Sequence, residues 1–445
     1  MTRTHVADTC AGGAGVHRNV AGFSLIELMV AITLGLLLSA GIVTLFSGTG
    51  KTNRVQDALA RLQENGRYAV TRVDADLRML SGQYCTNFSG NSVATANGPQ
   101  LSLRAPWMYA ANMTLPDAGA PFVFATATPI SPRLFVQGYE CSTGTCSPAI
   151  PILGASPIPA VGTVDGSRLK GTDVLTIRYL TGTGWPVSTT APPSCASGGN
   201  VTLAPQTGDD NPEAGTPSVP KFAAGDLAFI SDCQNPSILP VAAYGSNLLT
   251  LGAVLPGGAG GGPYCSAGAN RDTRVFNFTK NFVTVTYYVR LVADQNPDAA
   301  GRLIPTLMRR ENVSPTVAEQ EVVQGVERLD FLYGVRDLNG AMRYLTADQV
   351  DLQSGAGTCI APPDGVALEP GCLWRSVKSV EVHALLDSVD NVFDLSDPET
   401  EFRYTPDGSG FTTPVNGGTS TVTGLPNGRM LRREVVSLTS VRNAN

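Results

Sequence analysis

The sequence predicts an α+β fold: a long N-terminal helix, first transmembrane and then amphipathic, followed by a large β-rich globular head that contains disulfides. Three observations lead to this prediction. Residues 23–46 form an apolar run, and apolar residues then recur every three or four positions from residue 51 to about residue 80. Beyond Gly82 the composition shifts to Gly, Pro, Ser and Thr, with several period-two alternations typical of strands.

The apolar run carries a single charge, Glu27. At ~1.5 Å per residue it can cross a hydrocarbon core of ~30 Å once. A carboxylate in that environment costs roughly 2.5–3.5 kcal/mol at mid-helix and less near the interface, so Glu27 needs a stabilising partner. Residues 1–22 contain Arg3 and Arg18 but no apolar stretch, which predicts a cytoplasmic N-terminus and an exported C-terminus. A plain signal anchor is the alternative.

Residues 47–52 (SGTGKT) superficially match a phosphate-binding loop, but Leu45 occupies the position of its first glycine, so we interpret the segment as a flexible joint. The helical stripe that follows consists of Val55, Leu59, Leu62, Ala69, Val73, Leu77 and Leu80. Its opposite face is charged, as expected for an amphipathic helix that packs on the head.

Four period-two runs predict strands at residues 174–179, 283–289, 329–335 and 380–386. Asn339-Gly340 predicts a hairpin turn that leads into residues 342–345. The stretches 196–220 and 257–262 have the composition of surface loops.

The stretch GFSLIELM, residues 22–29, resembles the cleavage and methylation site of type IV prepilins and type II secretion pseudopilins. The resemblance implies that a membrane peptidase cuts between Gly22 and Phe23 and methylates the new amine of Phe23. That ammonium can then neutralise the Glu27 carboxylate of a neighbouring subunit. The implied pilin-like lollipop has four parts: a leader (1–22), a transmembrane and fibre-core helix (23–46), an amphipathic helix (47–82) and a head (83–445), which forms one body or two subdomains.

Cysteine usage fits an exported head. Cys10 lies in the leader, and the remaining eight are Cys85, Cys141, Cys146, Cys195, Cys233, Cys265, Cys359 and Cys372. An even set in an exported domain predicts disulfides, whose connectivity the sequence does not fix beyond the two local pairs Cys141–Cys146 and Cys359–Cys372. A zinc site is the weaker alternative, because there is no C-x-x-C pair and one histidine, His383, lies beyond the leader.

The same histidine argues against catalysis. A Ser-His-Asp or Cys-His site would have to use His383, whose alternation with Glu381 places both on a solvated or edge face of a strand. We therefore expect no enzyme activity, no catalytic residues, no cofactor and no metal. The formal net charge of −6 gives no sign of a nucleic-acid groove.

Four distal segments narrow the resemblance to PilW-type minor pilins of type IV pili. They are GDLAFISDCQ (225–234), LMRRE (307–311), EVVQGVERLDFLYGV (321–335) and LRREVVSLTSVRN (431–443). The resemblance implies a subunit that joins other minor pilins in a complex that primes pilus assembly and sits at the fibre tip. Its implied partners are prepilin peptidase, other minor pilins, the major pilin and a tip adhesin.

The implied location is the inner membrane, with a single span, a cytoplasmic leader and a periplasmic head, and after processing the pilus at the cell surface. Two alternatives stay open. The J-type pseudopilins of type II secretion share the N-terminal motif and a β-rich head, although the size of this head favours PilW. A membrane-tethered adhesin or binding module would use the N-terminal helix merely as an anchor.

Overall fold

The computed structural model describes residues 24–80, 91–95, 98–102, 107–108, 132–141, 145–150, 158–188, 199–204, 222–231, 237–252, 273–293, 303–313, 316–336, 341–352, 371–390, 392, 402–406, 411–413 and 430–441. The chain divides into two compact units, Met1–Gln56 and Asp57–Asn445. The helix α1 (Leu25–Met79) contributes residues to both, and every strand belongs to the second.

Helix α1 is continuous through residues 47–52, where the sequence predicted a flexible joint. Two hydroxyls in this stretch bond back to the helix: Thr49 Oγ1 donates to the Leu45 carbonyl at 2.9 Å and Thr52 Oγ1 to the Gly48 carbonyl at 3.1 Å. A glycine inside a helix costs about 1 kcal/mol but leaves its hydrogen bond intact, and elongation adds one bond per residue. The helix therefore continues through Gly48 and Gly50.

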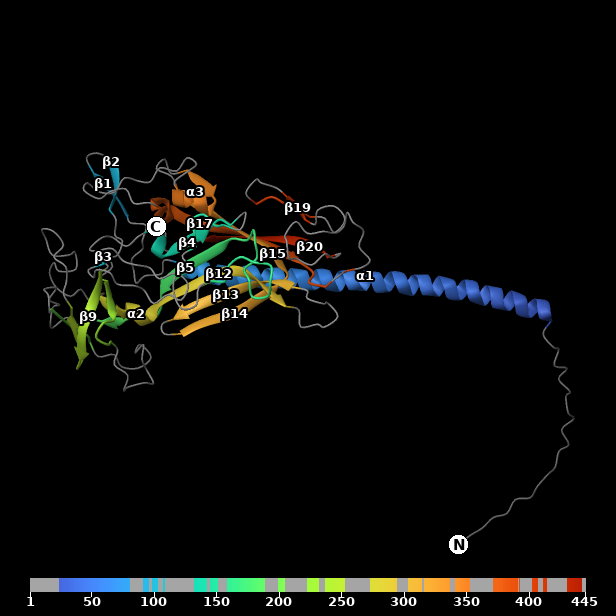
Figure 1. The fold of residues 1–445 in the computed structure, drawn as a ribbon, viewed down its shortest axis with the longest axis horizontal. Coiled ribbons are helices and arrows are strands. Elements are labelled where there is room, and N and C mark those ends of the chain that lie inside the picture. The colour runs from blue at the N-terminus through green and yellow to red at the C-terminus, as the bar shows by residue number, and fades with distance from the viewer. Residues whose placement is uncertain are drawn as a thin grey trace, which may run out of the picture. The chain divides into compact units, whose positions relative to one another are not determined.

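A five-stranded antiparallel sheet forms one layer of the second unit, in the order β14-β13-β12-β5-β4. Figure 1 shows β12, β13 and β14 side by side. The strands are β4 (Val136–Tyr139), β5 (Val174–Leu180), β12 (Phe282–Ala293), β13 (Leu303–Val313) and β14 (Thr316–Gln324). The predicted strands at 174–179 and 283–289 are thereby confirmed as β5 and part of β12.

A four-stranded antiparallel sheet has the order β16-β15-β17-β20. Its strands are β15 (Val326–Arg336), β16 (Met342–Leu345), β17 (Val377–Asp387) and β20 (Arg432–Ser440). The strands predicted at 329–335, 342–345 and 380–386 are confirmed, as is the hairpin between the first two, since β15 and β16 pair directly. The turn residues Asn339 and Gly340 lie outside the described residues.

His383 corrects one expectation. Its strand β17 is paired on both sides, with β15 and with β20, and its side chain is buried. The ring nitrogens of His383 contact Glu434 Oε1 at 2.7 Å and Glu381 Oε1 at 3.1 Å. The solvated or edge face predicted for this residue is therefore wrong, because β20, the last strand in sequence, pairs along the edge of β17 away from β15 and its Glu434 contacts the His383 ring.

A seven-stranded sheet follows the order β6-β11-β8-β9-β10-β7, with β3 parallel to β9. Its strands are β3 (Trp107–Met108), β6 (Trp185–Pro186), β7 (Asn200–Thr202), β8 (Leu227–Ser231), β9 (Ser237–Gly245), β10 (Leu248–Leu251) and β11 (Arg274–Asn277). The sequence patterns did not predict this sheet.

The remaining elements are short. They are β1 (Asn91–Thr95), β2 (Gly98–Ser102), η1 (Pro132–Leu134), α2 (Phe278–Asn281), α3 (Ala347–Leu352), η4 (Cys372–Ser376), β18 (Phe402–Tyr404) and β19 (Phe411–Thr413). Strands β1 and β2 pair with each other, as do β18 and β19.

Two large apolar clusters fill the second unit. One combines the buried side of α1 with both the five-stranded and the four-stranded sheets, and the other lies within the seven-stranded sheet. The C-terminal part of α1 is thus a core element of the head, since its residues Leu62, Ala69, Val73 and Leu77 are almost fully buried.

The structure joins Cys141 and Cys146 in a disulfide, one of the two local pairs proposed from sequence. Cys85, Cys195, Cys233, Cys265 and Cys359 lie outside the described residues, and so does the side chain of Cys372.

Candidate functional site

The N-terminus of α1 carries the charge singled out from the sequence. Glu27 lies in the first turn, and the Ser24 backbone N–H donates to its Oε2 at 3.4 Å while its own N–H donates to Ser24 Oγ at 3.2 Å. This reciprocal arrangement is a capping box, and the helix dipole favours a carboxylate at this end. Gly22 and Phe23, the residues expected at the processing site, lie outside the described residues.

The turns that follow Glu27 are apolar and exposed. Leu25, Leu37 and Phe46 are each more than 70 % exposed, and α1 is long and apolar enough to cross a membrane. Hydroxyls within this stretch bond to the helix's own carbonyls, Thr33 to Val30 at 2.9 Å and Thr44 to Gly41 at 2.8 Å. Such bonds keep a polar side chain satisfied where no water is present. This surface requires lipid or other apolar helices around it.

Within the second unit, the same helix packs tightly on β20. A Cβ added to Gly66 would lie 2.5 Å from Val435 Cγ2, so a larger residue at 66 would force the Val435 side chain to move. About two turns further along, Asp74 accepts hydrogen bonds from Ser437 Oγ at 2.6 Å and Thr439 Oγ1 at 2.5 Å. The segment 431–443, noted in the sequence, therefore contacts the helix directly.

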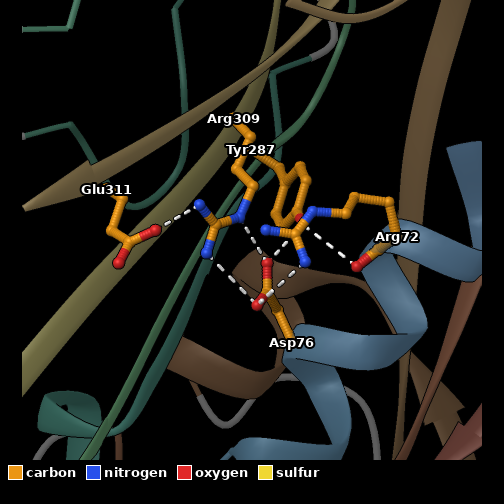
Figure 2. Close-up of polar contacts among 5 residues, drawn as sticks. All are labelled: Arg72, Asp76, Tyr287, Arg309 and Glu311. Carbon is orange, nitrogen blue, oxygen red and sulfur yellow. Dashed lines mark hydrogen bonds and ion pairs between the residues drawn. The ribbon is translucent and has the colours of Figure 1, made fainter. Parts of the chain in front are cut away.

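A buried ion pair fixes α1 to the five-stranded sheet (Figure 2). Asp76 of α1 is 4 % exposed and accepts from Arg309 Nε of β13 at 2.6 Å and from the Tyr287 hydroxyl of β12 at 2.5 Å. Arg72, one turn earlier, lies 3.9 Å from Asp76, and Glu311 contacts the far side of the Arg309 guanidinium. The pair thus joins residues 233 positions apart in the chain.

Electrostatics keep Tyr287 and Arg309 in the protonation states in which they donate hydrogen bonds. Burial, and then the charge of Asp76, raises the pKa of Tyr287, and the same two causes raise the pKa of Tyr179 to about 12. Burial acts to lower the pKa of Arg309, but its hydrogen bonds to Asp76 and Glu311 outweigh this and raise it. Tyr287 therefore stays a donor and Arg309 a cation across the physiological range.

The sequence analysis did not identify Ser24 or Asp76 as functional residues, although the sequence around each contains a recognisable pattern. Ser24 and Glu27 have the S-x-x-E spacing of a capping box. Asp76 lies three residues after Val73 and four before Leu80, on the apolar stripe itself, where an acid requires a buried partner. The identity of that partner, Arg309, carried no local signal.

A long apolar N-terminal helix that continues into the core of a β-rich head, with an acid in its first turn, is the arrangement expected of the type IV pilin class. Residues 17–43 match the prokaryotic N-terminal methylation motif, and this match contains Gly22, Phe23 and Glu27. Residues 286–443 match the family described as type IV pilus-assembly protein W, PilW. These two matches support a PilW-type type IV pilin with a prepilin leader, the resemblance that the sequence predicted.

The PilW match covers most of β12 and all of β13, β14, β15, β17 and β20. It includes both strands that supply the Asp76 partners and three of the four distal segments quoted above, while 225–234 falls outside it.

Among solved structures, a type IV-like pilin from Thermus thermophilus is 14 % identical, with 50 % of this chain and 86 % of that chain covered and a TM-score of 0.17. A score this low permits no strand-by-strand comparison, so the fold is read from this chain's own elements. None of the curated proteins matches the chain.

Proposed function

We propose that the chain is a minor pilin, cut by prepilin peptidase after Gly22, methylated on Phe23 and assembled with other minor pilins into a complex that primes the pilus and remains at its tip. The observation that carries the proposal is Glu27 in the first turn of an exposed apolar helix, inside the methylation-motif match. The PilW match favours a pilus over a type II secretion pseudopilus.

The capping box stabilises Glu27 only in part. It supplies hydrogen bonds and the partial charge of the helix terminus, worth up to about 2 kcal/mol in favourable geometry, but no counter-ion. Cleavage after Gly22 would create an ammonium on Phe23. Pairing that ammonium with the Glu27 carboxylate of an adjacent subunit leaves no uncompensated charge in the apolar layer.

The buried cluster around Asp76 supports a structural role for the head. A subunit that is drawn from the membrane into a fibre has to move its helix and head together. The Asp76–Arg309 ion pair and the α1–β20 packing make the C-terminal half of α1 inseparable from the head core. A helix that only anchored a binding module in the membrane would not need to be part of the head core.

Piliation in a strain in which deletion of the gene abolishes pili tests the proposal. Glu27→Gln keeps an acceptor for the Ser24 N–H but removes the charge, and we expect surface pili to fall to the deletion level in electron micrographs of sheared cells. Gly22→Ala should give the same loss and leave uncut precursor on an immunoblot.

Ser24→Ala is the matched control. It removes the hydroxyl cap, at a cost of about 1 kcal/mol of helix stability, but keeps the Glu27 charge, so pili should persist. Wild-type piliation with Glu27→Gln and Gly22→Ala would contradict the proposal. Normal pili combined with lost surface attachment would instead favour the tethered adhesin.

A further inference from the structure

The Cys141–Cys146 disulfide lies beside a buried cation. Arg168, in the segment before β5, is 5 % exposed, and its Nη2 donates to Cys146 Sγ at 3.4 Å. Its Nε and Nη1 have no hydrogen-bond partner in the part of the chain that the structure describes. Cys141 is 1 % exposed whereas Cys146 is half-buried, so Cys146 is the sulfur that a reagent reaches. The buried guanidinium therefore faces the accessible sulfur of the pair.

Arg168 lacks a close counter-charge. Among the described residues, no carboxylate forms an ion pair with its guanidinium, and Asp173 is the acid whose charge acts on it from a distance. Burial, and then the charges of Asp330 and Glu140, raise the pKa of Asp173 well above its usual value, which favours its uncharged form. Burial lowers the pKa of Arg168 by more than Asp173 raises it. A negative charge close to Arg168 would therefore stabilise this part of the head.

Backbone hydrogen bonds position both partners independently of the disulfide. Glu140 and Ser147 exchange two such bonds, at 2.9 and 2.8 Å, and these close the loop that contains both cysteines. The Arg168 N–H donates to the Ala160 carbonyl at 2.9 Å, which fixes the segment that carries the guanidinium. When the disulfide opens, these bonds keep Cys146 within reach of Arg168 and keep the two sulfurs close enough to pair again.

We propose that this disulfide is a reversible redox site, at which Cys146 exchanges with a dithiol or its disulfide and Arg168 stabilises the Cys146 thiolate. The thiolate is the reactive form of cysteine, and a neighbouring arginine favours it over the thiol. In the oxidised protein the Arg168 guanidinium has no ion-pair partner among the described residues, and in the reduced protein the thiolate supplies one. The contact therefore stabilises the reduced form relative to the same disulfide without Arg168.

Reduction transfers two electrons from the dithiol in two exchange steps. A thiolate of the dithiol attacks Cys146 Sγ, so that a mixed disulfide forms, the Cys141–Cys146 bond breaks and Cys141 leaves and takes up a proton. The second thiolate of the reagent then attacks the reagent's own sulfur in the mixed disulfide. This closes the disulfide of the oxidised reagent and releases the Cys146 thiolate beside Arg168. One proton of the dithiol thus passes to Cys141 and the other to solvent, and re-oxidation reverses the same steps.

The other titratable groups around the pair do not replace Arg168. Glu140 lies on the same loop, and its negative charge would disfavour a thiolate, as would any remaining charge on Asp173. On β12, Arg290 forms a β-bridge with Arg168, but its Nη1 lies 2.6 Å from Glu319 of β14, which offsets its charge. Tyr288 packs in the same apolar cluster as the cysteines, and its hydroxyl donates to that glutamate. A lowered thiolate pKa at Cys146 would therefore report on Arg168.

Alkylation of the reduced full chain in detergent, followed at each cysteine by tandem mass spectrometry, tests the proposal. The rate of iodoacetamide addition at a series of pH values gives the pH at which half of Cys146 is thiolate. We expect this at or below about pH 7.5, against about 8.5 for an unperturbed cysteine. The same chain denatured in urea gives the unperturbed profile of the same sulfur.

Arg168→Met keeps the length of the side chain and removes its charge. We expect it to return the Cys146 profile to that of the denatured chain. In a dithiothreitol redox buffer at pH 8, it should also lower the ratio of reduced to oxidised pair about fivefold. Arg168→Lys should retain most of both effects, because it keeps a cation. Arg61→Met, which removes an exposed cation of α1, is the matched control and should change neither.

A Cys146 profile that is the same in wild type and Arg168→Met would overturn the proposal, and so would equal reduction ratios in the two proteins. If Arg168→Met does not fold, wild type decides alone: a folded, reduced chain in which Cys146 titrates like the denatured chain contradicts the proposal. Near-UV circular dichroism reports whether the reduced head stays folded. A head that unfolds when this pair is reduced would also overturn the proposal, because a reversible site requires a folded reduced form.

Discussion

At the residue scale, buried acids of this protein lie next to one another and to an arginine. Asp387 of β17 and Glu327 of β15 are each 2 % exposed and lie together, with Arg432 of β20 donating to both Glu327 oxygens at 2.8 Å. The Val389 N–H donates to Asp387 Oδ1 at 2.8 Å. Arg432 donates to Glu327, and the burial of Asp387 beside that carboxylate favours the protonated form of Asp387.

Asp387 predicts a pH dependence of stability. Burial, and then the charge of Glu327, raises its folded-state pKa well above the unfolded value of about 4. Folding therefore takes up a proton, and the stability from protonated Asp387 is complete below about pH 4 and is lost as pH rises through the folded-state pKa. We expect Asp387→Asn to flatten this part of the profile, as measured by urea unfolding at a series of pH values.

Other buried acids shift the wild-type profile in the same direction, so the difference between the two proteins isolates Asp387. Asp57→Asn serves as a control, because Asp57 is exposed on α1. Parallel profiles for wild type and Asp387→Asn would show that this residue is already ionised in the folded head.

At the scale of elements, a buried ion pair is one of the contacts that attach α1 to the sheets. Asp76 and Arg309 side chains are each 6 % exposed, and truncating one partner of such a pair costs about 3–5 kcal/mol, because the other charge stays buried. We expect Asp76→Leu and Arg309→Met each to destabilise the head by that amount in chemical unfolding. The double variant should lose much less than the sum, since it buries no unpaired charge.

The exposed pair Asp57–Arg61 on the same helix is the internal control. Its Oδ2 and Nε lie 3.1 Å apart but the side chains are 64 % and 70 % exposed, so its removal should cost under about 1 kcal/mol. Additive losses in the Asp76–Arg309 double variant would mean that the two residues act separately rather than as a pair.

Elements with strong local periodicity were predictable from sequence. Strands β5, β12, β15 and β17 follow from alternation, α1 from its apolar run and stripe, and the Cys141–Cys146 pair from its separation of five residues. The seven-stranded sheet was missed because five of its strands are four residues or shorter, too short to show an alternating pattern. His383 was misplaced because strand order, which puts β20 beside β17, is a non-local property.

For the candidate site, the sequence supplied Glu27 and the processing motif but not the partner of Asp76. Local patterns report which residues must be buried, not which distant residue meets them. Arg309 lies within LMRRE, a segment noted only for its resemblance, and nothing near it indicates that it contacts α1.

At the scale of the whole molecule, the two compact units differ in what surrounds their part of α1. The apolar turns of α1 up to Phe46 expose side chains that require lipid or other apolar helices, whereas the buried side of α1 from Leu62 onward is part of the head core. The same helix is thus an assembly surface at one end and a structural element at the other. Processing after Gly22 is what would convert the first from a membrane anchor into a fibre subunit.

The most direct test of this account is the intact mass of the native protein isolated from sheared pili and, separately, from the inner membrane. The account predicts that the pilus-associated form lacks residues 1–22 and carries one methyl group on the amine of Phe23. A pilus-associated form that still retains the leader would contradict it, because no ammonium would then exist to pair with Glu27.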